Sequence, residues 1–151
     1  MPNTTKLQLD SVRDLKLDAN AYCNDNSQEK YHIVLDALLR CYLSEAVLIC
    51  PYQDSGDGMT TPGVLPGPDG KFYYVAFTSE KEAARANMNR HMEMKLSDIL
   101  YTLYTYREDE ELGGLMINLR SHGDCLISLK DCVDMEEKYA KLVGHVEILQ
   151  R

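Results

Sequence analysis

A tract rich in glycine and proline divides the sequence and limits its folds more than any other feature. Its eighteen residues, 53–70 (QDSGDGMTTPGVLPGPDG), contain five glycines and three prolines, which interrupt helices and strands alike. The apolar run AVLICPY (46–52) precedes the tract, and the aromatic run KFYYVAF (71–77) follows it. Both runs have the composition of β-strands, and Asp69-Gly70 is typical of a turn. We therefore expect a long loop that closes a hairpin.

Helical patterns lie on both sides of this hairpin. After Asn26, which with Glu29 resembles a capping box, apolar residues recur at helical spacing and predict a helix that ends near Leu43. Ser79 with Glu82 three residues later predicts the start of an alanine-rich helix. The alternating run HMEMKL (91–96) then predicts a strand, and the next helix has three inward residues: Leu100, Leu103 and Tyr104.

A second hairpin is predicted in the last third of the chain. Gly113-Gly114 is expected to turn the chain into the strand LMINL, and the link RSHGD leads to the strand CLISL. The run KDCVDMEEKYAKLV predicts a final helix that is closed by Gly144. The run HVEIL (145–149) predicts a last strand.

These elements alternate in an order that indicates the fold class. They favour an α+β protein with a mixed β-sheet of about five to six strands and helices packed against it. No glycine-rich dinucleotide or phosphate-binding motif follows a strand, which argues against a doubly wound fold. We expect a single domain over 26–151. The preceding segment, 1–25, is poorly defined, because its short alternating runs KLQLD and DLKLD predict an edge strand or a loose chain.

Charge and cysteine content exclude several functional classes. The formal net charge is −8 and the isoelectric point is near 4.9, which disfavours binding to nucleic acid or to an anionic membrane surface. No apolar run approaches the roughly 20 residues of a membrane span, and the N-terminus lacks the apolar core of a signal peptide. Five cysteines without a C-x-x-C pair indicate free thiols, so we expect a cytoplasmic protein. The four histidines are scattered singly, and we predict no metal site and no cofactor.

Several short motifs together resemble the N-terminal domain of the bacterial SseB family, named for enhanced serine sensitivity. They are CPY at the end of a strand, the long loop, VAFTS at the start of a helix, and GLMINLRSHGDCLISL. The resemblance covers residues 28–149, and its anchors are Pro51, the Phe77-Thr78-Ser79 corner, Ile117-Asn118 and Gly123. Leu119 stands where family members have proline, and the link to Gly123 is longer. The resemblance implies an α-plus-β domain without known catalytic residues. Longer members carry a second domain, and functions that need it are expected to be absent.

The chemistry-bearing motifs favour structural roles over catalysis. In HGDC (122–125), a thiol lies near an imidazole and a carboxylate, but Cys125 begins an apolar strand, where burial makes a thiol inert. Ser79 is accounted for as a helix cap. Asn118 is more often a brace for loop backbone than a ligand contact. We therefore predict no catalytic residue.

Two functional hypotheses follow. The favoured one is a non-enzymatic interaction or regulatory module whose partner is another protein. Its contact surface is the tract, with Met59, Val64 and Leu65, and the outward member of the Tyr73-Tyr74 pair. The alternative is a small-molecule-binding protein or enzyme. Its site is expected near the Thr78-Ser79 corner, with Asn118 and His122.

Overall fold

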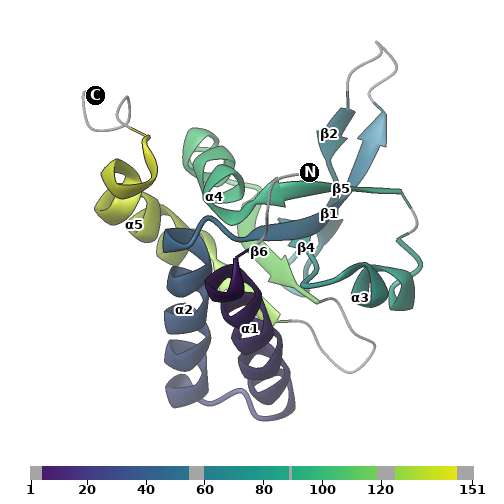
Figure 1. Cartoon of the computed structure of the whole chain (residues 1–151). Helices are drawn as coiled ribbons and strands as arrows, with labels where there is room; N and C mark the ends of the chain where they lie inside the picture. The colour runs from purple at the N-terminus through teal and green to yellow at the C-terminus, as the bar shows by residue number, and fades with distance from the viewer. Residues whose placement is uncertain (1–4, 55–59, 89, 119–124, 146–151) are drawn as a thin grey trace.

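Two small β-sheets that meet at one bridge form the centre of the molecule (Figure 1). The computed structural model describes residues 5–54, 60–88, 90–118 and 125–145. The first sheet is antiparallel, in the order β2-β1-β5, with β1 (Val47–Asp54), β2 (Thr60–Pro62) and β5 (His91–Lys95). The second is mixed, in the order β3-β4-β6-β7, and only its β4–β6 pair is parallel. Its strands are β3 (Val64–Pro66), β4 (Phe72–Ala76), β6 (Leu112–Ile117) and β7 (Cys125–Ser128).

The bridge joins β1 to the residue that follows β4. The backbone N–H of Ile49 donates to the carbonyl oxygen of Phe77 at 2.9 Å, and the N–H of Phe77 donates to that of Ile49 at 2.7 Å. The predicted α+β class is therefore confirmed, with short strands distributed over two bridged sheets.

Five α-helices surround the sheets within the described residues. They are α1 (Lys6–Asn24), α2 (Gln28–Leu43), α3 (Glu80–Arg85), α4 (Leu96–Thr105) and α5 (Leu129–Tyr139), and α5 continues into a 3-10 turn, η1 (Ala140–Val143). The side chains of four residues accept a hydrogen bond from the first turn of a helix, which fixes where it begins: Thr5, Ser27, Ser79 and Ser128. The predicted cap at Ser79 is confirmed, whereas α2 is capped by Ser27 instead of Asn26.

The N-terminal segment was expected to be an edge strand or a loose chain, and this expectation is wrong for Lys6–Asn24, which forms a helix. Thr5 and Gln8 make a complete capping box at its start. The buried residues of α1 are Ser11, Leu15 and Ala19, which stand four apart and form one helical face against α2 and β7.

The expectation of a long loop between two hairpin strands is also wrong. The first half of the tract extends β1 and returns as β2, while its second half forms β3 and pairs with β4. The tract therefore makes two small hairpins, and β1 does not form a ladder with β4. The Asp69-Gly70 turn lies between β3 and β4, where Gly70 has a φ of 80°.

The second half of the chain follows the predicted order. Strands β5, β6 and β7, helices α4 and α5, and the closing Gly144, with a φ of 86°, lie where they were expected. Gly113-Gly114 lies inside β6 instead of before it. The predicted last strand falls in 145–149, of which only His145 belongs to the described residues.

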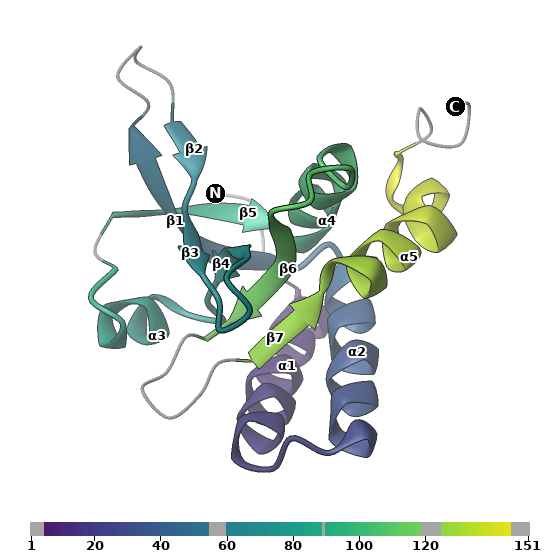
Figure 2. The ribbon, with the colours of Figure 1, turned by 180° about the vertical axis from the view of Figure 1, so that it is seen from behind.

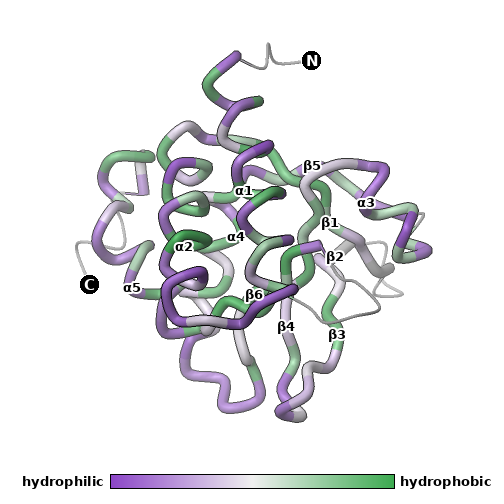
Figure 3. Tube along the Cα trace, turned by 90° about the horizontal axis from the view of Figure 1, so that it is seen from below, coloured by the Kyte–Doolittle hydropathy of each residue, from purple (hydrophilic) through white to green (hydrophobic). Residues whose placement is uncertain are grey.

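The strands send alternate side chains to opposite faces of the sheets, and the two faces have different covers. Tyr74 and Ala76 of β4 pack in a large core beneath α1, α2, α4 and α5, whereas Tyr73 and Val75 pack in a small core beneath α3. Figures 1 and 2 show α3 alone on its side of the strands. Apolar stretches of α2, β1 and β6 run through the interior between helices and strands (Figure 3).

Candidate partner-binding groove

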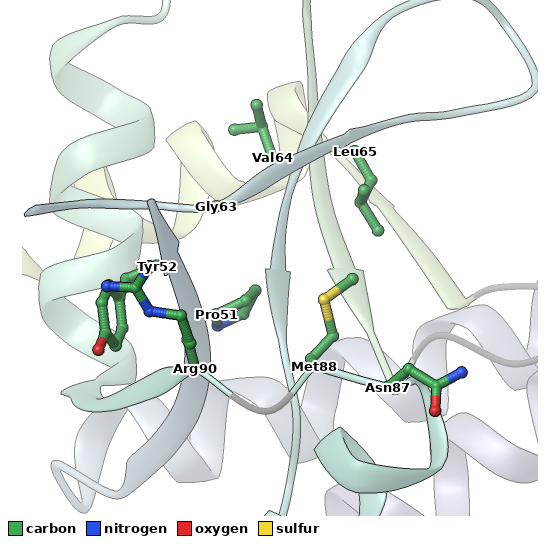
Figure 4. Close-up of a pocket in the computed structure, with 8 residues that line it drawn as sticks. All are labelled: Pro51, Tyr52, Gly63, Val64, Leu65, Asn87, Met88 and Arg90. Atoms are coloured by element: carbon green, nitrogen blue, oxygen red, sulfur yellow. The ribbon is translucent and has the colours of Figure 1, made fainter. Parts of the chain in front are cut away.

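An open groove of about 350 Å³ lies over the small core, between the end of β1, the start of β3 and the segment after α3 (Figure 4). Its lining is apolar at the centre, from Pro51, Val64, Leu65 and Met88, and polar at its ends, from Tyr52, Asn87 and Arg90. Two of the residues predicted to contact a partner, Val64 and Leu65, therefore belong to one cavity.

The wall that contains β3 is positioned by a close crossing of the chain over Pro51. The backbone N–H of Gly63 donates to the carbonyl oxygen of Pro51 at 2.8 Å. A Cβ atom at residue 63 would lie 3.2 Å from Cγ of Pro51, so glycine permits this approach. The following residue pairs, Val64 with Tyr74 and Leu65 with Tyr73, then continue the antiparallel β3–β4 ladder.

The opposite wall is set by the way in which α3 ends. The N–H of Asn87 donates to the Ala84 carbonyl at 3.0 Å, and the N–H of Met88 donates to the Ala83 carbonyl at 2.9 Å. These are the two hydrogen bonds of a Schellman motif, which requires a left-handed residue, here Asn87 with a φ of 60°. The motif sends Met88 across the groove toward Leu65 (Figure 4), and both side chains rest on the small core.

One end of the groove carries a stacked cation. The Arg90 guanidinium lies 4.9 Å from the centre of the Tyr52 ring, and the Tyr52 N–H donates to the Arg90 carbonyl at 3.2 Å. Arg90 is exposed. Stacking on an aromatic face holds a guanidinium in place.

Tyr73 supports the groove from below and does not face solvent. Its ring is 6% exposed and occupies the space that side chains at Gly67 and Gly113 would fill. Its hydroxyl donates to the Asp69 carboxylate at 2.9 Å, and burial, together with this hydrogen bond, raises the pKa of Tyr73 to about 12. Tyr74 is half-buried against the large core. Neither tyrosine is the outward-facing residue that the alternation predicted.

The Thr78-Ser79 corner is a structural clamp. The Asn118 side chain accepts a hydrogen bond from the Thr78 N–H and donates one to the Thr78 hydroxyl, both at 2.9 Å. Asn118 is 1% exposed and left-handed, with a φ of 50°. The bracing role predicted for Asn118 is confirmed, and the Ser79 hydroxyl caps α3 by accepting from the Glu82 N–H at 3.2 Å. His122 and Met59, which completed the two predicted surfaces, lie outside the described residues.

Sequence patterns did not single out Tyr52, Asn87, Met88 and Arg90 as parts of this site. They belong to two separate segments, 51–52 and 87–90, which meet each other and β3 only in the folded chain, so no local spacing reveals the site. The sequence contained one indication of the groove, the apolar pair Val64 and Leu65 in a tract that otherwise has few side chains to bury.

No family model, curated protein or solved structure gives a significant match to this chain. The resemblance to the SseB family therefore stays a prediction. Among the described residues, no helix is long and apolar enough to cross a membrane, and no three His, Cys, Asp or Glu side chains gather as a metal site.

Proposed function

We propose that this protein is a non-enzymatic interaction module of the SseB type, which binds an extended segment of a partner protein in the groove. The observation that carries the proposal is the pair of apolar side chains, Leu65 and Met88, that approach each other from two walls of an open cavity. A partner that fills this space removes apolar surface from water, which stabilises a complex by roughly 25 cal/mol per Å².

The groove also indicates the chemistry of the segment. An apolar side chain, such as leucine, methionine or phenylalanine, fits between Leu65 and Met88, and methionine adapts its shape to such a guest. A carboxylate beside that side chain pairs with the stacked guanidinium of Arg90. Because the chain carries a net charge of −8, the rest of the segment is neutral or basic.

The proposed setting is the bacterial cytoplasm. It rests on the SseB resemblance and on the five cysteines, all of which are free thiols in the structure.

The proposal is tested by selecting binders from a random peptide library displayed on phage against the immobilised protein. The affinity of the enriched peptides is then compared for the wild type and for Met88→Ser, Arg90→Gln and Leu142→Ser. Leu142→Ser is the matched control, because Leu142 is 71% exposed in η1, outside the groove. We expect Met88→Ser to weaken binding at least tenfold, as for a central contact. We expect Arg90→Gln to weaken it only for peptides that carry a carboxylate.

Failure of the library to yield a binder, or equal affinity for the wild type and Met88→Ser, contradicts the proposal. Urea unfolding of each variant shows whether a loss of affinity reflects the groove or the fold.

A small-molecule ligand is the second candidate, favoured by the groove volume, which lies at the lower end of the range for ligand pockets. A fragment screen monitored by NMR distinguishes a small-molecule ligand from a peptide partner. Shifts confined to the groove residues, in a protein that selects no peptide, support this second candidate over the first.

A further inference from the structure

Two cysteines that are distant in the sequence meet at the lower edge of the large core. Cys23 is the penultimate residue of α1, and Cys125 is the first residue of β7. The Cys125 side chain contacts that of Cys23, and this contact, together with burial, raises the pKa of the Cys125 thiol. Both side chains pack in the same apolar cluster, and α1 lies alongside β7 (Figure 2).

We propose that Cys23 and Cys125 are a redox-sensitive dithiol, a modification site at which a low-molecular-weight disulfide oxidises the pair to an intramolecular disulfide.

The reaction proceeds in two balanced exchanges. The Cys23 thiolate, after losing its proton to solvent, attacks one sulfur of the oxidant, forms a mixed disulfide and releases one thiolate. The Cys125 sulfur then attacks Cys23 Sγ, the mixed disulfide breaks, and the second thiol leaves with the proton of Cys125. The two cysteines lose two electrons, and the oxidant is reduced to two thiols.

The different burial of the two thiols sets the order of these steps. Cys23 is half-buried and accessible to a small oxidant, whereas Cys125 is fully buried. The contact with Cys23 and burial hold the pKa of the Cys125 thiol above its ordinary range, which keeps it protonated until a mixed disulfide is beside it. Cys23 is therefore the attacking residue and Cys125 the resolving residue.

The other three thiols are protected from the same reaction. Cys41, Cys50 and Cys132 are 0–2% exposed, and burial raises the pKa of both Cys41 and Cys50 to about 12. Burial likewise holds the pKa of Cys132 above its ordinary range. Oxidation is therefore confined to the pair.

The backbone at the pair can adjust to disulfide geometry. Cys125 is paired with Ile117 in the β6–β7 ladder, whereas Cys23 lies in the last turn of α1, and helix ends fray, so the adjustment comes from the α1 side. The bond would link residues about 100 positions apart, a loop length at which a disulfide restricts the unfolded chain strongly.

The test incubates the folded full-length protein with oxidised glutathione and counts free thiols in denaturant. We expect the count to fall from five to three, peptide mapping to recover a Cys23–Cys125 cross-link, the melting temperature to rise, and dithiothreitol to reverse all three. In Cys125→Ala, Cys23 should stop as a mixed disulfide that carries one glutathionyl group. In Cys23→Ser, no thiol should be lost, and the matched control Cys132→Ser should still lose two.

Three results would overturn the proposal. They are a thiol count that stays at five while a denatured sample oxidises, a loss of two thiols in Cys23→Ser, and a disulfide-linked dimer as the main product. The readout on Cys23→Ser does not depend on whether Cys125→Ala folds.

Discussion

The two faces of the sheets differ in how completely they are covered. Four helices, α1, α2, α4 and α5, seal one face over a large core, and α3 with the β3–β4 hairpin covers the other. On the helical face one carboxyl group is internal and is held by two side chains. Glu136 is fully buried and accepts a hydrogen bond from the Tyr42 hydroxyl at 2.5 Å, with Nδ1 of His145 at 2.7 Å from its other oxygen.

The face beneath α3 is covered by one short helix and one hairpin, and this cover leaves apolar side chains accessible. Leu65 and Met88 pack on the small core but also line the groove. The large core therefore lies on one face of the strands, and the proposed function assigns partner binding to the opposite face. Substitutions on the helical face should change mainly the free energy of unfolding, and those on the groove face mainly binding.

The largest effect is expected where the two faces share backbone, at Gly114 in β6. A Cβ atom there would lie 2.0 Å from the Ile127 carbonyl oxygen, and the φ of 143° is unfavourable for any side chain. We expect Gly114→Ala to lower the free energy of unfolding by about 4 kcal/mol or more.

The neighbouring residue is the matched control. A Cβ at Gly113 would lie 2.5 Å from Cζ of Tyr73, which is the far end of a side chain and can shift more easily than backbone. Gly113→Ala should therefore cost about 1–3 kcal/mol. Urea unfolding of both variants measures the two losses of free energy of unfolding. Equal losses would show that the β7 backbone beside Gly114 shifts as readily as the Tyr73 ring beside Gly113.

The second prediction compares one leucine from each face. Leu38 of α2 is fully buried in the large core, so Leu38→Ala should lower the free energy of unfolding by about 2–5 kcal/mol. Leu65 of β3 is half-buried, so Leu65→Ala should cost about 1 kcal/mol. Urea midpoints measure both, and a loss for Leu65→Ala as large as that for Leu38→Ala would remove the distinction between the faces.

The third prediction concerns the clamp that holds the parallel strands β4 and β6 at their ends. Asn118→Ala leaves the Thr78 N–H without its acceptor. The alanine must also adopt the left-handed φ of 50° without the side-chain hydrogen bonds that hold asparagine there. The free energy of unfolding should fall by about 1–3 kcal/mol.

Two further variants separate the causes of this loss. Asn118→Gly relieves the backbone strain but still lacks both hydrogen bonds of the asparagine side chain. Thr78→Val removes only the hydrogen bond between the two side chains. We expect Thr78→Val to be the mildest of the three in urea unfolding. A Thr78→Val loss that matches Asn118→Ala would mean that the backbone bond contributes nothing.

Local signals in the sequence predicted the elements whose pattern coincides with burial. The β4–α3 corner was predictable because Ser79 both ends a strand-like run and caps the helix that follows. In β6 and β7 the apolar residues of 115–117 and 125–127 pack on both faces of the sheet, so the length and composition of the two runs indicated strands.

Helix α1 was not predictable because most of its leucines are exposed and most residues of its buried face are small. Leu7, Leu9 and Leu17 are 55–65% exposed, and they created the apparent strand alternation. Two of the three residues on its buried face, Ser11 and Ala19, are small and carry little hydrophobic signal. The groove escaped prediction for another reason, because β1, β3 and the end of α3 come together only through the topology of the two sheets.

The smallest expected effect compares tyrosines on the two faces at high pH. Burial and hydrogen bonds to carboxylates raise the pKa of Tyr73 to about 12 and that of Tyr42 further, so folding favours the protonated phenol in both. An unfolded tyrosine has a pKa of about 10. The resulting stability is fully present below pH about 10, and for Tyr73 it is lost as the pH rises from about 10 to about 12.

The variants Tyr73→Phe and Tyr42→Phe separate the two contributions. At neutral pH, Tyr73→Phe should cost about 1 kcal/mol or less, because the Asp69 carboxylate that loses its donor is exposed to water. Tyr42→Phe should cost more, because the Glu136 carboxylate that loses its donor is buried. Above pH about 10, the free energy of unfolding should fall less steeply with pH in each variant than in the wild type, as measured by urea unfolding at a series of pH values. An unchanged slope in Tyr73→Phe would show that this phenol ionises as freely in the folded protein as in the unfolded chain, and that the face beneath α3 is open to water down to the strand.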